Sequence, residues 1–170
     1  MKLLFDFIAD KENCRILVKR EFAASKPLVW EAWTNPEILD LWWAPKPFQT
    51  KTKHMDFRVG GMWLYCMEGP DNQTHWCRAD YLSIQPLESY SGLDAFCDEE
   101  ANINPAFPRT TWHVKFEEQG EHTFVSIENR FEKLEDLEQI IELGFKEGFT
   151  MAMGNLDDYF ANQQSTNHFN

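Results

Sequence analysis

The sequence predicts an α+β fold, in which a curved antiparallel β-sheet wraps on a long C-terminal helix and two short helices follow the first strand. Three observations predict it. Residues 48–131 form short apolar–polar segments separated by Gly, Pro and Asn turns, as in a strand meander. Residues 134–160 carry apolar side chains at helical spacing. Two helix-start signals lie within residues 25–42.

The first strand is predicted over residues 14–22, where apolar and polar residues alternate. Ser25 can cap a short helix after it. The sequence Thr34-Asn-Pro-Glu37 begins a second helix, because it combines a capping residue, an early proline and a Glu three residues after Thr34. Pro45 and Pro47 end that helix.

Six strands joined by turns are predicted next, over residues 49–58, 62–68, 73–84, 89–96, 110–117 and 123–131. Gly60 and Gly61 form the first reversal, since glycine adopts positive φ without strain. Residues 97–109 are the segment with the weakest pattern. We interpret them as a rim or lid loop, or as a flexible connection.

The last helix is predicted from about residue 134 to about residue 160, with one apolar stripe. Gly144 and Gly148 lie one turn apart on that stripe, and each mid-helix glycine costs roughly 1 kcal/mol relative to alanine. We therefore expect a sheet, a bulky ring or a ligand to approach closely there. We expect residues 1–170 to form one domain, with a core over about 14–160 and a frayed tail over 161–170.

Composition excludes several classes of function. The net charge of −12 disfavours binding to nucleic acids or acidic membranes, because both require basic surface. No stretch approaches the roughly 20 apolar residues of a membrane span, and the apolar N-terminus is too short for a secretory signal. We predict a cytoplasmic protein with no membrane span and no nucleic-acid partner. Its four cysteines lack Cys-x-x-Cys spacing and are expected to stay reduced.

The chain resembles the homologues of the activator of the 90-kDa heat-shock-protein ATPase, which belong to the START-like, helix-grip superfamily, also called SRPBCC. The resemblance covers about residues 14–160. Its residues are Arg20, Phe22, Ala23, the run Val29-Trp-Glu-Ala-Trp33, Thr34-Asn-Pro-Glu37, Leu39, Trp42, Trp43, Asp56, Arg58, Gly60, Gly61, Trp63, Tyr65, Met67, the run Gly69-Pro-Asp71, the run Ile84-Gln-Pro86, Thr123, Gly148, Phe149, Leu156 and Tyr159. Phe149 stands where the family usually has Trp, and residues 97–109 look longer than usual.

The resemblance implies a helix-grip fold with a hydrophobic cavity, but no single activity. Members of the superfamily bind lipids, sterols or polyketides, and some catalyse cyclisation or related steps. The co-chaperone name comes from relatives with an additional domain. The resemblance therefore predicts a cavity between sheet and last helix, and leaves its use open.

Trp63, Tyr65 and Met67 alternate along one predicted strand and so share one face. We predict that this face lines the cavity, with ordinary core packing as the alternative. Adjacent Trp42 and Trp43 cannot both be buried on one helix face, and Asn155 is polar on the apolar stripe. The predicted cavity residues are Trp42, Met55, Trp63, Tyr65, Met67, His75, Trp112, Gly148, Phe149, Ala152 and Asn155.

No catalytic residue, metal site or cofactor is predicted. A zinc site from Cys66, His75 and Cys77 lacks the usual ligand spacing. The favoured function is binding of a small hydrophobic or amphipathic ligand. The second hypothesis is a protein-interaction domain with a chaperone partner. The third is a cyclase- or hydrolase-type enzyme, which requires a buried ionisable residue, with His75, His113 and Glu128 as candidates.

Overall fold

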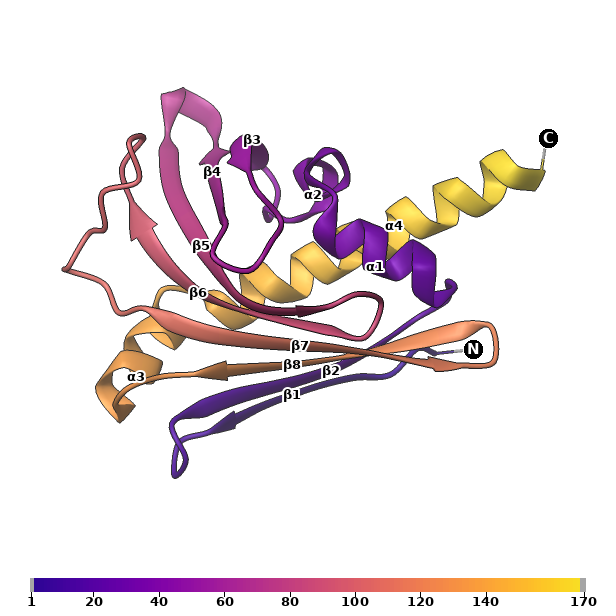
Figure 1. The fold of residues 1–170 in the computed structure, drawn as a ribbon, viewed down its shortest axis with the longest axis horizontal. Coiled ribbons are helices and arrows are strands. Elements are labelled where there is room, and N and C mark those ends of the chain that lie inside the picture. Colours follow the sequence, from indigo (N-terminus) through magenta and orange to yellow (C-terminus); the bar gives the residue numbers. More distant parts are fainter. Residues whose placement is uncertain (1, 169–170) are drawn as a thin grey trace.

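A computed structural model describes residues 2–168 of the chain, and the side chains of residues 2–163. Its eight strands form one antiparallel sheet in the order β1-β2-β8-β7-β6-β5-β4-β3 (Figure 1). The strands are β1 (Phe5–Asp10), β2 (Arg15–Phe22), β3 (Gln49–Met55), β4 (Met62–Glu68), β5 (Thr74–Gln85), β6 (Ser89–Cys97), β7 (Thr110–Gln119) and β8 (His122–Arg130). The helices are α1 (Lys26–Thr34), α2 (Pro36–Trp42), the 3-10 turn η1 (Pro70–Asn72), α3 (Leu134–Glu142) and α4 (Phe145–His168). The predicted α+β fold is confirmed.

Strand β1 is the element that the sequence pattern does not predict. It pairs with β2 along its whole length, from Phe5 opposite Arg20 to Asp10 opposite Arg15. Phe5 and Phe7 pack against the core, whereas the intervening Asp6 points away from it. A strand of an antiparallel sheet needs only one apolar face, so the acidic residues on the other face of β1 destabilise it little. The same acidic residues interrupt its apolar pattern in the sequence.

The two short helices begin where their start signals predict. The backbone oxygen of Ser25 accepts a hydrogen bond from the Val29 amide, although the Ser25 side chain makes no cap. The Asn35 side chain accepts from the Glu37 amide at 3.0 Å and caps α2. The helices bury Trp33 against Trp42, with ring centroids 4.9 Å apart, and so close one end of the core.

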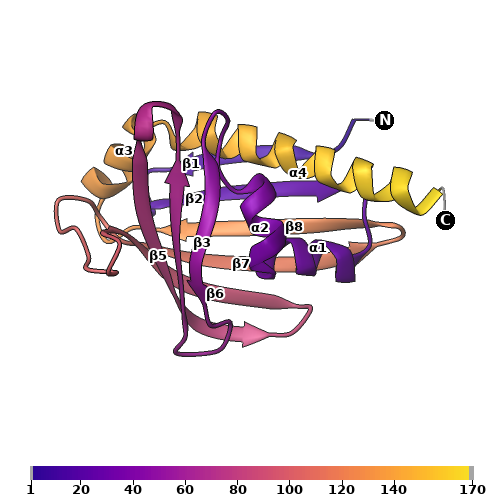
Figure 2. The same cartoon turned by 90° about the horizontal axis from the view of Figure 1, so that it is seen from above.

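Helix α4 covers one face of the sheet, whose strands turn so strongly that β3, β4 and β5 run across the direction of β1 and β2 (Figure 2). Its middle turns pack tightly, and Met153, Leu156 and Phe160 are buried. The ring of Phe160 meets Phe22 of β2 edge-on at 5.6 Å. No helix among residues 2–168 combines the length and apolarity needed to cross a membrane.

The last helical segment is not the single helix that the apolar stripe predicts. Gly144 has φ +92°, a left-handed conformation that ends α3 and separates it from α4. Gly148 remains inside α4, and a Cβ there would lie 3.6 Å from Pro45 rather than against the sheet. Helix α4 runs to His168, so residues 161–168, expected to fray, are helical here. The rest of the expected tail lies outside the described residues.

A partly buried ion pair joins α4 to the sheet. The Arg20 side chain of β2 is only 7% exposed, and its guanidinium donates to the Asp157 carboxylate of α4 and to the Glu21 carbonyl. The guanidinium also lies 4.9 Å from the ring centre of Phe22. Because a buried guanidinium without a counter-charge is costly, this pair fixes where the helix crosses β2.

The break at Gly144 predicts opposite effects for two glycine substitutions. Gly144→Ala should destabilise the protein by roughly 1–2 kcal/mol, because a side chain disfavours the left-handed conformation. A steric clash is not the reason, since the nearest atom of the described residues to a Cβ at Gly144, apart from its chain neighbours, is Glu147 Oε2 at 4.0 Å. Gly154→Ala, at an exposed position inside α4, should stabilise by up to about 1 kcal/mol. Urea unfolding of both variants measures the two changes in stability. Equal changes would contradict the left-handed break at Gly144.

The ion pair predicts that Asp157→Asn destabilises the protein by roughly 1–3 kcal/mol, because Arg20 keeps its buried charge and loses the counter-charge. Asp158→Asn removes the same charge at the neighbouring exposed position and should change stability by less than about 0.5 kcal/mol. Denaturant unfolding midpoints give both values. A similar loss in the two variants would show that the pair does not hold α4.

Candidate functional site

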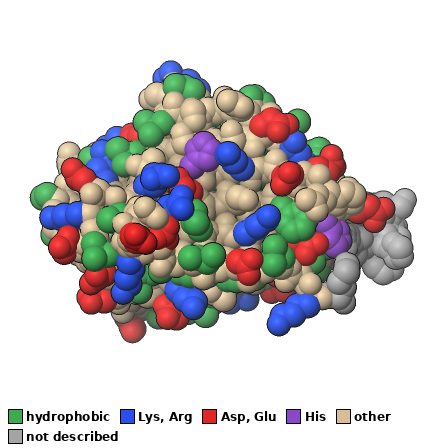
Figure 3. Space-filling model, turned by 90° about the horizontal axis from the view of Figure 1, so that it is seen from below, with side chains coloured by type: hydrophobic (Ala, Val, Ile, Leu, Met, Phe, Trp, Pro, Cys, Tyr) green, Lys and Arg blue, Asp and Glu red, His purple; other side chains and the backbone are tan. Residues whose placement is uncertain are grey.

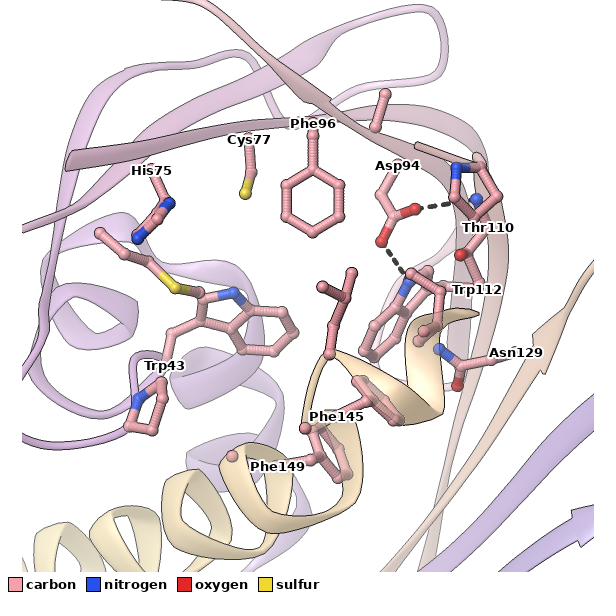
Figure 4. A pocket seen from close by; sticks show the side chains of 18 of the residues that line it. Trp43, His75, Cys77, Asp94, Phe96, Thr110, Trp112, Asn129, Phe145 and Phe149 are labelled. Atoms are coloured by element: carbon pink, nitrogen blue, oxygen red, sulfur yellow. Dashed lines mark hydrogen bonds between the residues drawn. The ribbon is translucent and has the colours of Figure 1, made fainter. Parts of the chain in front are cut away.

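A cavity of about 260 Å³ lies where the N-terminal end of α4 leaves the sheet (Figure 4). Strands β4 to β8 form one side, the segment after α2 forms another, and the α3–α4 junction forms the third. The loop before β7 contributes Pro108. Most of the wall is apolar, as is usual for sites that bind small organic molecules.

Six Trp, Tyr and Phe side chains line the wall: Trp43, Tyr65, Phe96, Trp112, Phe145 and Phe149. Trp43 follows α2, Trp112 lies on β7, and Phe145 and Phe149 lie on the first turns of α4. The ring centroid of Trp112 is 5.7 Å from that of Trp43 and 6.0 Å from that of Phe149. Phe145 and Phe149 stack at 5.4 Å. The rings line the space from both the sheet and the helix.

Asp94 places a carboxyl group in this aromatic wall. It lies on β6, opposite Thr110 of β7, and its side chain points toward Trp112 (Figure 4). One carboxylate oxygen accepts from the Trp112 indole nitrogen at 2.6 Å, and the other accepts from the Thr110 amide at 2.9 Å. Arg109 donates to the Asp94 backbone oxygen at 3.3 Å, but its guanidinium pairs with Asp80.

Burial raises the pKa of the Asp94 carboxyl to about 7, because its charged form loses hydration in the apolar wall. The hydrogen bonds from Trp112 and Thr110, and the charge of Arg109, oppose that rise. Asp94 therefore changes charge near neutral pH. An acid tuned in this way and placed in a cavity is typical of a functional site.

Asn129 of β8 adds an amide to the wall. It is only 1% exposed and lies opposite Trp112 in the β7–β8 register. Its Oδ1 has no hydrogen-bond partner among the described residues. A buried amide with unused capacity is available to a bound molecule.

Three other polar side chains contribute less. The Tyr65 hydroxyl accepts from the Trp43 indole nitrogen at 3.0 Å, and burial raises the pKa of Tyr65. Burial also raises the pKa of the Cys77 thiol to about 12, so Cys77 is not a nucleophile at neutral pH. His75 lies at the exposed rim, its ring 5.6 Å from that of Phe48.

The structure brings six of the predicted cavity residues together in the wall: Tyr65, Met67, His75, Trp112, Gly148 and Phe149. Trp63 lies beside it, stacked on Tyr65 with ring centroids 4.0 Å apart. It lines a separate void of about 40 Å³. Whether these residues contact a ligand stays a prediction.

Four other predicted residues lie outside the wall: Trp42, Met55, Ala152 and Asn155. Trp42 is buried against Trp33, and its indole nitrogen donates to the Ala32 oxygen at 2.9 Å, so its neighbour Trp43 takes the place in the wall. The Asn155 amide donates to the Ala44 oxygen at 3.1 Å, which explains a polar residue on the stripe. Met55 and Ala152 pack with the core.

Of the three ionisable residues proposed for an enzyme, only His75 reaches the cavity. His113 and Glu128 line a groove on the opposite face of the sheet, and Glu128 pairs there with Arg15 and Arg130. Asp94 was not among the sequence candidates. The sequence feature that could have identified Asp94 is its position between Gly92 and Phe96, on the apolar face of the predicted strand.

Comparisons with known proteins agree with this architecture. A family model described as Activator of Hsp90 ATPase homolog 1-like protein matches residues 23–161. A crystal structure from Mycobacterium smegmatis has a TM-score of 0.85 at 26% identity, covering 93% of this chain and 96% of that one. An Arthrobacter aurescens solution structure has a TM-score of 0.85 at 28% identity, covering 89% and 88%. The structure of the AHSA1 protein of Silicibacter pomeroyi has a TM-score of 0.70 at 17% identity, covering 88% of this chain and 99% of that one. The search of curated proteins returns no match.

The raised pKa of Asp94 predicts how stability depends on pH. The folded state holds the proton up to about pH 7, whereas the unfolded chain releases it near pH 3.8, so this contribution is lost as pH rises through that window. Between pH 5 and pH 8 the wild type should lose roughly 2 kcal/mol more than Asp94→Asn, which cannot titrate. The Asn amide also loses one hydrogen bond, but that loss is independent of pH. Urea unfolding at both pH values measures the free energy of unfolding of each protein. An equal loss of stability in the wild type and in Asp94→Asn would contradict the raised pKa of Asp94.

Proposed function

The chain belongs to the Activator of Hsp90 ATPase homolog 1-like family of the SRPBCC superfamily, and on this premise we propose that it binds a small amphipathic molecule between sheet and C-terminal helix. The observation that carries the proposal is a mostly apolar cavity, rich in aromatic rings, with a carboxyl group and an amide in its wall. Sites for small organic molecules combine these two features: apolar surface gives affinity, and a few polar groups fix orientation.

The size of the cavity limits the ligand. An apolar cavity of about 150 Å³ accommodates a benzene molecule. A cavity of about 260 Å³ therefore has room for one ring and a short side chain. It is smaller than the range of roughly 300–1,000 Å³ found for drug-sized ligands, so a long-chain lipid or a sterol does not fit without rearrangement.

The amphipathic character follows from the positions of Asp94 and Asn129. Both lie on the sheet side of the cavity, near Trp112, whereas the helix side is formed by Phe145, Phe149 and other uncharged residues. A ligand with one polar end would direct that end to the sheet. Its apolar body would lie against α4, where burial of apolar surface supplies roughly 25 cal/mol per Å².

A chaperone-type interaction has less support from the surface. Large apolar side chains that are exposed occur on separate elements, such as Ile8 on β1, Leu41 on α2 and Leu82 on β5. On the face shown in Figure 3, acidic and basic side chains are interspersed among the hydrophobic ones. This arrangement is not the contiguous apolar patch that a protein-docking site usually presents.

The first test is a two-dimensional amide NMR titration with a library of small aromatic and amphipathic metabolites. Binding predicts shifts that cluster at Trp43, Asp94, Trp112 and the Gly144–Phe149 turn. Shifts confined to the outer face of the sheet would contradict the proposal. The absence of shifts with every compound would do so as well.

Filling the cavity from the helix side should weaken binding. In Gly148→Leu the Cβ fits beside Pro45 at 3.6 Å, and the remaining atoms occupy the space of the ligand. We expect affinity for any ligand found in the library to fall at least tenfold, which corresponds to about 1.4 kcal/mol. The matched control is Gly154→Leu, the same change at an exposed position of α4, where an added Cβ meets no atom of the described residues within 4 Å apart from its own helix backbone and chain neighbours. Equal affinities in the two variants would place the ligand elsewhere.

A further inference from the structure

Resting on this proposed function, we propose that the ligand is an amphipathic amine: its protonated nitrogen pairs with the Asp94 carboxylate, and its apolar body lies among Trp43, Trp112, Phe145 and Phe149. The charges of the wall, the free hydrogen-bonding capacity of Asp94 and the placement of the rings favour such a ligand.

Among the described residues, the cavity wall holds the carboxyl group of Asp94 and no Lys or Arg side chain. The nearest guanidinium, that of Arg109, donates to the Asp80 carboxylate at 2.9 Å and to backbone oxygens of β6. A carboxylate or phosphate ligand would therefore meet Asp94 without a compensating cation, which is strongly unfavourable in an apolar space. A cationic ligand supplies the missing charge.

Asp94 still has acceptor capacity. A carboxylate offers about four acceptor positions on its two oxygens. The Trp112 indole and the Thr110 amide use one position on each oxygen and also fix the orientation of the group. Asp94 lines the cavity, so a donor inside it can reach the remaining positions. An ammonium group donates up to three hydrogen bonds, and the amide of Asn129 is a second acceptor on the same side.

The rings receive the apolar body of the ligand, next to the carboxylate that pairs with its ammonium group. Trp112 is shared between the two halves of the site, since its indole nitrogen donates to Asp94 at 2.6 Å and its ring meets Phe145 at 6.0 Å. The net charge of −12 also raises the local concentration of cations around the protein.

Binding of such a ligand should tighten as pH rises from 6 to 8. The pKa of Asp94 is about 7, and only its ionised form makes the ion pair. An aliphatic ammonium such as that of lysine titrates at about pH 10.4 and stays charged. Of the groups facing Asp94, Arg109 stays cationic, and burial raises the pKa values of Tyr65 and Cys77, which keeps both neutral. His75 at the rim is the remaining ionisable side chain of the wall, so a variant without it serves as a control.

The test compares three probes with one carbon skeleton: 2-phenylethylamine, 2-phenylethanol and phenylacetate. Calorimetric titration at pH 8 should give a Kd for the amine at least tenfold lower than for the alcohol, and weaker binding still for phenylacetate. Asp94→Asn should reduce the amine-to-alcohol preference to less than twofold. Asp158→Asn removes a charge from the exposed surface of α4 and should retain the preference.

If the alcohol or phenylacetate binds the wild type as tightly as the amine, the inference is overturned, while ligand binding in the cavity stands. If none of the three binds, the inference is overturned too, and the library titration with Gly148→Leu decides the proposed function separately. Should Asp94→Asn fail to fold, the wild type still decides: amine affinity must rise between pH 6 and pH 8, and alcohol affinity must not. Repeating the pH series in His75→Gln removes any contribution of the histidine to the pH dependence of amine affinity. If the pH dependence disappears in this variant, its assignment to Asp94 is contradicted.

Discussion

The architecture depends on one packing constraint: a single helix has to cover the inner face of a sheet that turns through a large angle (Figure 2). The middle turns of helix α4 pack directly on this face, where Leu156 and Phe160 are buried and Asp157 meets the guanidinium of Arg20. Toward its N-terminus the sheet curves away. The chain fills the widening space with large rings and with α3, which Gly144 turns aside. The cavity is what this filling leaves unoccupied.

The carboxyl group of Asp94 makes that space more than a packing defect. An apolar residue at this position would avoid the loss of hydration that raises the pKa of Asp94 to about 7. Instead, Trp112 and Thr110 hold the group in one orientation at the cavity wall. A protein that keeps a polar group where it disfavours folding usually uses that group. A bound cation would remove the penalty, because its charge stabilises the ionised carboxylate.

Most of the fold could be predicted from the sequence, because strand alternation, capping residues and the helical stripe are local patterns. Strand β1 was not predicted, because Asp6 and Asp10 interrupt its apolar residues and its stability comes from pairing with β2. The break at Gly144 escaped because Ile141 and Phe145 continue the stripe across it. For the cavity, periodicity predicted the face of Tyr65 and Met67, but the prediction placed Trp42 in the wall where the structure has Trp43. Asp94 escaped because its role depends on Trp112, which only the β6–β7 pairing brings near.

The measurement that tests this account most directly is a carbon-13 NMR titration of the Asp94 carboxyl carbon, with and without saturating 2-phenylethylamine. The account predicts a midpoint near pH 7 in the free protein, because the carboxyl is buried among rings. It predicts a clearly lower midpoint in the complex, because the ammonium favours the carboxylate. A midpoint near the ordinary value of 3.8 in the free protein, or one that the amine leaves unchanged, would contradict it.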